Sequence, residues 1–174
     1  PLDALLHDVI AEQYWSYYRD NRWEIMERTA LAEGTGDMAT WTQPQFMEKV
    51  IAEYRASLKD ADSLKAVPNE RIANILLPVS TERPEDLERI KREGLRLRPT
   101  LFDLLAHRAL DVFRNTETRV AEPASRFTLN DARHFGLFED FAHMRLAHAD
   151  SSSWELQVIH RYRELERAHL SDTK

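Results

Sequence analysis

The chain has 174 residues, of which 43% are hydrophobic and 31% are charged, and its sequence contains no cysteine. The formal net charge of −6 argues against nucleic acid or an anionic membrane surface as the main partner, because phosphates attract basic patches. Without cysteine, the sequence excludes disulfides, zinc–thiolate sites and a cysteine nucleophile. No stretch of the sequence is long and apolar enough to span a membrane.

The length fits one domain over residues 1–174. Only four glycines occur, while Ala, Leu, Glu and Arg are abundant, and this composition favours helix. We therefore predict an all-α fold, an irregular bundle of about six to eight helices with little or no β-structure. A helical-repeat-like arrangement is an alternative, since the last helix has the Leu/Tyr pattern of a repeat hairpin.

The first helix is predicted from residue 2 to about residue 20, because its apolar residues share one wide arc. These residues are Leu2, Leu5, Leu6, Val9, Ile10, Tyr14 and Tyr17. The run at 19–22 predicts a turn or break, and residues 23–31 are expected to resume as helix. The aromatic side chains of this region are Tyr14, Trp15, Tyr17, Tyr18 and Trp23. We interpret them as core with an amphipathic edge; the alternative is an exposed recognition patch.

The tract at 33–40, EGTGDMAT, is predicted to be a loop. It lacks the third glycine and the preceding strand of a nucleotide-binding loop. The next helix begins with a predicted capping box, in which Thr42 caps and Gln45 reaches back. Its apolar residues continue at helical spacing until Pro68 forces a stop.

Asn69 is predicted to cap a short helical piece that ends at Pro78. The stretch from Pro84 to Glu93 predicts a surface helix, with proline early, acids in the first turn and bases in the last. Gly94 is expected to stop this helix.

The stretch at 95–115, LRLRPTLFDLLAHRALDVFRN, predicts a helix that lies at the centre of the fold. Thr100 is expected to cap it, with Asp103 in the first turn. Its apolar face is broad enough to need cover from several other helices: Leu101, Leu104, Leu105, Ala109, Val112 and Phe113. Asp103, His107 and Asp111 are predicted to form a polar stripe on the opposite side.

After this helix, residues 116–129 lack a helical period and are expected to be extended, with a short turn capped by Thr128. Residues 137–147 predict another helix. Ser152 is expected to open the last helix through a second capping box. The apolar stripe of that helix is Val158, Ile159, Tyr162, Leu165 and His169.

Asp103, His107 and Asp111 are spaced i, i+4, i+8 and could in principle bind a cation. No HExxH or similar paired-ligand motif accompanies them, so we favour a solvated stripe, or an arrangement in which His107 is held by hydrogen bonds to a neighbouring helix. The serines at 151–153 lack the Gly-x-Ser-x-Gly elbow of a nucleophile. We therefore predict no catalytic residue, no metal, no cofactor and no enzyme activity.

Three stretches carry a resemblance to a known family: residues 5–29, 39–64 and 95–115. They resemble the helical region near the N-terminus of bacterial alpha-2-macroglobulin-like proteins of the Bacteroidetes, which precedes a chain of β-sandwich macroglobulin domains. The resemblance implies a non-catalytic accessory or scaffold domain, and a fragment of a much larger multidomain protease inhibitor. Endopeptidase inhibition would belong to the rest of that chain. The thioester motif of trapping macroglobulins needs a cysteine, so it cannot lie in this sequence.

The resemblance also implies partners and a location. The partners would be other domains of the same chain and, through the full-length protein, proteases. The location would be the cell envelope, in the periplasm or on the extracellular side, and any signal peptide is expected to lie outside this sequence.

The alternative hypothesis is a helical-repeat-like protein–protein interaction module that is unrelated to protease inhibition. The residues predicted for an interaction surface are Trp15, Tyr18, Trp23, Trp41, Asp103, His107 and Asp111.

Overall fold

The computed structural model describes residues 1–28, 36–72, 83–115, 135–143 and 154–169 of the chain. Every regular element within these ranges is helical, and the only β-type pairing there is an isolated antiparallel bridge between Pro68 and Thr100. The predicted all-α multi-helix bundle is thus confirmed. The described elements are α1 (Leu2–Glu27), η1 (Met38–Thr40), α2 (Gln43–Ser57), α3 (Ala61–Lys65), η2 (Asn69–Arg71), α5 (Pro84–Leu97), α6 (Leu101–Phe113), α7 (Phe138–His143) and α8 (Trp154–His169).

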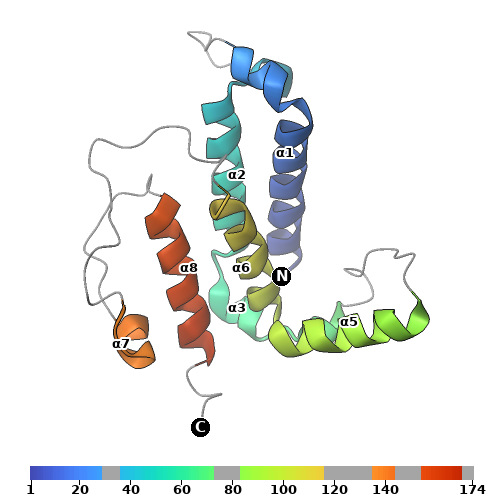
Figure 1. The fold of residues 1–174 in the computed structure, drawn as a ribbon, viewed down its shortest axis with the longest axis vertical. Coiled ribbons are helices and arrows are strands. Elements are labelled where there is room, and N and C mark those ends of the chain that lie inside the picture. The colour runs from blue at the N-terminus through green and yellow to red at the C-terminus, as the bar shows by residue number, and fades with distance from the viewer. Residues whose placement is uncertain (29–35, 73–82, 116–134, 144–153, 170–174) are drawn as a thin grey trace.

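The helices α1 and α2 run antiparallel, side by side (Figure 1). Their contact is the most extensive between any two described helices. α1 bends at Asn21, whose φ of −115° and ψ of 15° are not helical. The Asn21 side chain donates a hydrogen bond to the Tyr17 carbonyl oxygen at 2.9 Å. The predicted break at 19–22 is therefore confirmed as a kink. The helix ends at Glu27, because Arg28 is extended, and not at residue 31 as predicted.

The predicted capping box at the start of α2 is present. The backbone N–H of Thr42 donates to Oε1 of Gln45 at 2.8 Å. The single helix predicted to run up to Pro68 is wrong, because α2 ends at Ser57 and α3 begins at Ala61. Ser57 Oγ donates to the Tyr54 carbonyl oxygen at 2.8 Å, the local side-chain bond that competes with helix continuation.

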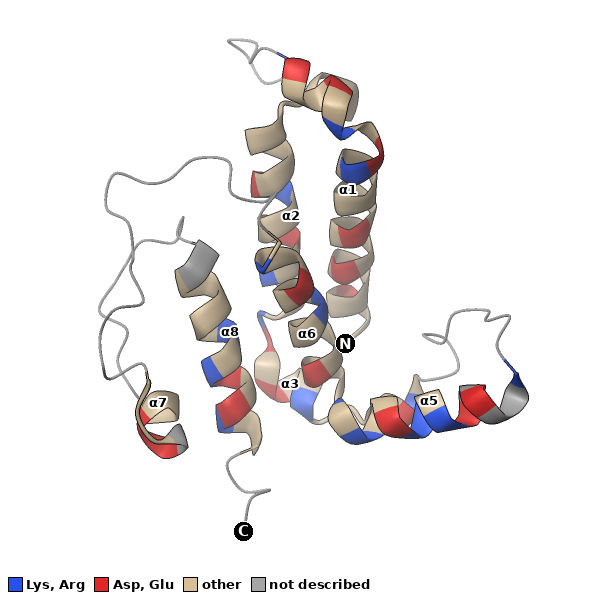
Figure 2. Cartoon of the chain, viewed as in Figure 1, with Lys and Arg blue, Asp and Glu red and all other residues tan. Residues whose placement is uncertain are grey.

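Helix α5 projects away from the base of the bundle (Figure 1) and is densely covered with both signs of charge (Figure 2). This arrangement agrees with the predicted surface helix. Gly94 does not stop the helix as predicted, because its carbonyl oxygen accepts a 2.9 Å hydrogen bond from the Arg98 N–H and the helix continues to Leu97. The glycine faces open space, and its φ is not positive.

Helix α6 lies at the centre of the fold, as predicted, where it contacts α2, α3 and α8. Nine of its 13 residues are buried. Its apolar face belongs to one core cluster shared with α1, α2, α3 and α8. The largest fully buried side chains of the described core are Tyr18, Ile25, Phe46, Val50, Tyr54, Leu64, Leu101, Phe102, Leu105, Leu110 and Leu156.

Helix α8 packs against α6 on one side and against α7 on the other. Leu156 and Ile159 form a small second cluster with Phe141 of α7. Because α8 is covered on two sides, its buried residues do not follow the single predicted stripe. Tyr162, predicted to face inward, is exposed, whereas Arg163 is buried.

Several predictions fall on residues that the structure does not describe. They are the extended segment at 116–129, the turn capped by Thr128, residues 144–147 of the helix predicted at 137–147, and the cap at Ser152. In the parts that the structure does describe, no helix combines the length and hydropathy that a bilayer crossing needs.

Replacing Leu105 in α6 by alanine should lower the free energy of unfolding by about 3 kcal/mol, because the truncation leaves a cavity in a fully buried site. Urea denaturation of the wild type and of Leu105→Ala measures this difference. Leu97→Ala is the matched control on exposed α5 and should change stability by less than about 0.5 kcal/mol. Equal losses for the two variants would contradict the central position of α6.

Candidate functional site

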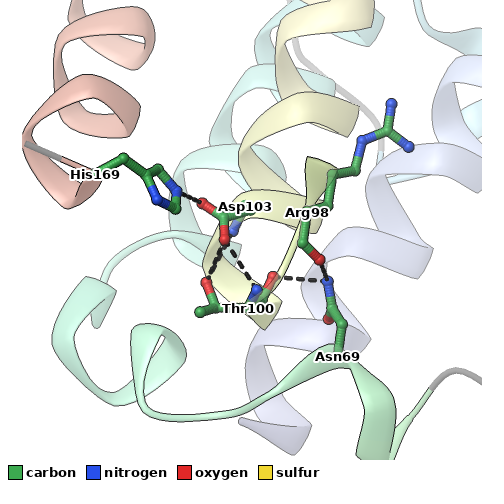
Figure 3. A network of polar contacts seen from close by, with 5 residues as sticks. All are labelled: Asn69, Arg98, Thr100, Asp103 and His169. Atoms are coloured by element: carbon green, nitrogen blue, oxygen red, sulfur yellow. Dashed lines mark hydrogen bonds and ion pairs between the residues drawn. The ribbon is translucent and has the colours of Figure 1, made fainter. Parts of the chain in front are cut away.

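Asp103, predicted to lie on a solvated stripe, is 1% exposed and links two helices (Figure 3). Its Oδ2 accepts hydrogen bonds from the backbone N–H of Thr100 at 2.9 Å and from the Thr100 hydroxyl at 2.7 Å. Its Oδ1 lies 2.7 Å from Nε2 of His169, which donates to it. The carboxylate therefore completes the predicted cap of α6 and also holds the last residue of α8. The prediction of an exposed Asp103 was wrong, because α8 packs over it.

Asn69 holds the segment that leads into α6, on the other side of the same cap (Figure 3). Its Nδ2 donates to the carbonyl oxygens of Arg98 at 2.6 Å and Thr100 at 2.7 Å. Its backbone N–H donates to the Pro99 carbonyl oxygen at 2.9 Å. The prediction that Asn69 caps a helix was wrong, since the residue at the cap position of η2 is Pro68. An asparagine that follows a proline can either cap a helix or bind the backbone of a distant segment. The local sequence therefore did not identify the second role for Asn69.

The other two members of the predicted stripe lie differently. His107 is half-buried, and burial, followed by the nearby Arg98 guanidinium, lowers the pKa of its imidazole. This shift favours the neutral form of the ring. Asp111 is exposed. No group of three or more His, Asp or Glu side chains in the described ranges is arranged to hold a metal ion.

Most of the aromatic residues considered for an interaction surface are in the core. Trp15, Tyr18 and Trp41 are buried. The Trp41 ring packs edge-on against Phe46 at 5.3 Å between ring centroids, and Tyr18 lies 6.3 Å from the same ring. Trp15, Tyr18 and Trp41 therefore cannot form an exposed patch, because the α1–α2 interface covers them. Trp23 differs, with 71% of its surface exposed beyond the kink of α1.

The first turns of α1 carry a second apolar face that points away from the core. It consists of Leu2, Leu6 and Val9, which are 81%, 57% and 49% exposed. We call these three residues the outer face of α1. They belong to the predicted apolar arc, yet α2 covers the opposite side of the helix, where Ala11 and Trp15 are buried. A helix that is apolar on both sides normally has cover on both sides, and this signal was present in the sequence.

α1 carries two more exposed apolar residues past the kink. Trp23 and Met26 are both exposed there, three residues apart on the helix. The Arg22 guanidinium lies 4.7 Å from the Trp23 ring centroid, within the range of a cation–π interaction. Half of the exposed large hydrophobic residues of the described chain lie on α1.

Charged groups also connect α1 to its neighbours. Nδ1 of His7 lies 2.6 Å from Oε2 of Glu53 on α2. Nη1 of Arg108 on α6 lies 3.0 Å from Oδ2 of Asp8 on α1. Burial raises the pKa of the Tyr54 hydroxyl well above its usual range, so this phenol stays neutral. The contacts of His7 with Glu53 and of Arg108 with Asp8 fix which side of α1 faces inward.

An open pocket lies between η2 and α5. Its lining includes Glu70 together with Glu88, Lys91, Arg92, Leu95 and Arg96 of α5. The lining mixes both signs of charge and offers one apolar side chain. It resembles an ordinary solvated surface rather than the largely apolar lining of a small-molecule site.

Comparison with models of protein families, with curated proteins and with solved structures gives no match to this chain.

Replacing Asp103 by alanine should lower the free energy of unfolding by about 2–4 kcal/mol, since it removes the carboxylate half of the capping box and leaves the Thr100 N–H, the Thr100 hydroxyl and the His169 ring without their acceptor. Asp111→Ala, on the exposed side of the same helix, is the control and should change stability by less than about 0.5 kcal/mol. Thermal unfolding of both variants measures the effect. An Asp103→Ala variant as stable as the control would show that this carboxylate does not hold the helices together.

Proposed function

We propose that this chain is a non-catalytic helical module that docks onto another protein surface through α1. The observation that carries the proposal is the outer face of α1 with the exposed Trp23 and Met26 beyond the kink. Exposed apolar side chains gathered on one element are typical of docking surfaces, and tryptophan is enriched at the centres of protein interfaces. The polar groups buried in the bundle, such as Asp103 and Asn69, are used to join helices.

We further propose that the module is an accessory domain of a bacterial alpha-2-macroglobulin-like protease inhibitor of the cell envelope, as the sequence resemblance implies. The three resembling stretches supply α1, α2 with α3, and α6, which are the helices that build the core. In this role the outer face of α1 would pack against a neighbouring domain of the same chain. Inhibition of proteases would be carried by the other domains.

The alternative is a protein-interaction module with no link to protease inhibition. The same surface of α1 supports it, with an independent protein as partner. The complete coding sequence distinguishes the two functions: a long downstream run of β-rich domains is expected for the first, and its absence would leave the second.

Replacing Leu6 by glutamate should weaken docking by about thirtyfold, because a central apolar contact of an interface contributes about 2 kcal/mol. The test measures binding of the 174-residue module to the remainder of the full-length protein by biolayer interferometry. Ile90→Glu, which alters an exposed apolar residue on α5, should bind like the wild type.

Circular dichroism should show that both variants keep the wild-type melting temperature, since the two positions are exposed. Equal binding of Leu6→Glu and wild type, with both folded, would contradict α1 as the docking surface.

A further inference from the structure

The place where α1, α2 and α6 meet holds more carboxylates than cations. We call it the carboxylate junction, and it comprises Asp8 and Glu12 of α1, Tyr54 of α2 and Arg108 of α6. Asp8 is 0% exposed. Nη1 of Arg108 lies 3.0 Å from Asp8 Oδ2, but without the alignment of a hydrogen bond, and neither carboxyl oxygen of Asp8 has a hydrogen-bond donor among the described residues.

Arg108 is shared between the two acids. Its Nη2 lies 4.0 Å from Oε2 of Glu12, and the Tyr54 hydroxyl donates to the same oxygen at 3.2 Å. Arg19 reaches only Oε1 of Glu12, at 4.0 Å, from a half-exposed position. Within the described part of the chain, Arg108 is thus the one cation paired with Asp8.

The other titratable groups near this part of α1 face elsewhere. His7 precedes Asp8 in the sequence, but its Nδ1 is 2.6 Å from Glu53 of α2 and its Nε2 is 3.8 Å from Asp3. Its ring is thus paired with two acids that lie outside the junction.

A fully buried carboxylate without hydrogen bonds is unfavourable, and a shared guanidinium offsets this only in part. An arginine cannot release its proton, so the charge balance of the junction changes only when a carboxyl group takes one up. We propose that the carboxylate junction is a proton-binding site: protonation of Asp8 holds the first half of α1 tightly on the bundle, and loss of that proton loosens it.

The direction of the pH effect follows from linkage. Burial outweighs the attraction of Arg108 and raises the pKa of Asp8 from its ordinary 3.8 to about 6. The folded state therefore binds this proton more tightly than the unfolded chain. The stabilisation is fully present below about pH 4 and is lost as the pH rises through about 6. A shift of this size can change the equilibrium for opening α1 by up to about 100-fold.

This inference does not depend on what α1 docks onto. Asp8 lies on the inward side of the same turns of α1 that present Leu6 and Val9 to solvent. A change in how firmly this segment is held alters how those two side chains are presented.

Hydrogen–deuterium exchange of the whole chain between about pH 5 and pH 7.5, corrected for intrinsic exchange rates, tests the proposal. In the wild type, amide protection in residues 2–11 should fall by about tenfold as the pH rises. Asp8→Asn mimics the protonated side chain, so it should be equally protected at both pH values and should melt at a higher temperature than the wild type at pH 7.5. Asp3→Asn changes an exposed acid on the same helix and should behave like the wild type.

Two results would overturn the proposal: protection of α1 that does not vary with pH in the wild type, or an Asp8→Asn variant that is folded and less stable than the wild type at pH 7.5. Should Asp8→Asn fail to fold, carboxyl carbon NMR of the wild type gives the answer directly. A titration midpoint for Asp8 near 6 supports the proposal. A midpoint at or below its ordinary value contradicts it.

Discussion

The fold depends on how α6 is held at its first turn. Asp103 accepts two hydrogen bonds from Thr100 and one from His169, so one buried carboxylate caps α6 and anchors α8. Asn69 holds the preceding segment from the opposite side. These polar contacts specify the direction in which α6 enters the bundle. The buried apolar face of α6 then supplies most of its attachment to α2, α3 and α8.

Among the described residues, helix α1, unlike α6, is covered on one side only. One side of this helix packs against α2 through a dense set of aromatic rings, while Leu2, Leu6 and Val9 on the other side are exposed to solvent. Covering one face of a helix is enough to attach it, so the fold does not require the second face to be buried. An apolar face that the fold does not use is free to serve an interface, and this is the physical basis of the proposed docking role.

Buried polar groups fall into two kinds in this bundle. Both carboxyl oxygens of Asp103 accept hydrogen bonds from nearby donors, which offsets the cost of burying this side chain. Asp8 has one shared cation and no aligned donor, so its ionised form is unfavourable. Asp103 and Asp8 are thus equally buried but have different roles. Asp103 joins two helices, whereas Asp8 responds to pH.

The sequence by itself determined the elements whose formation depends on neighbours a few residues away. The capping box at Thr42, the cap at Thr100 and the kink near Asn21 involve partners along the same segment, and each was predicted. The apolar face of α6 was also predicted, from the spacing of its own residues. Tertiary structure alone decided which side of α1 is covered, that α8 buries Asp103, and that Asn69 holds the entry to α6. In each of these cases the local pattern fits two arrangements equally well, and only residues distant in the chain, brought close in space, choose between them.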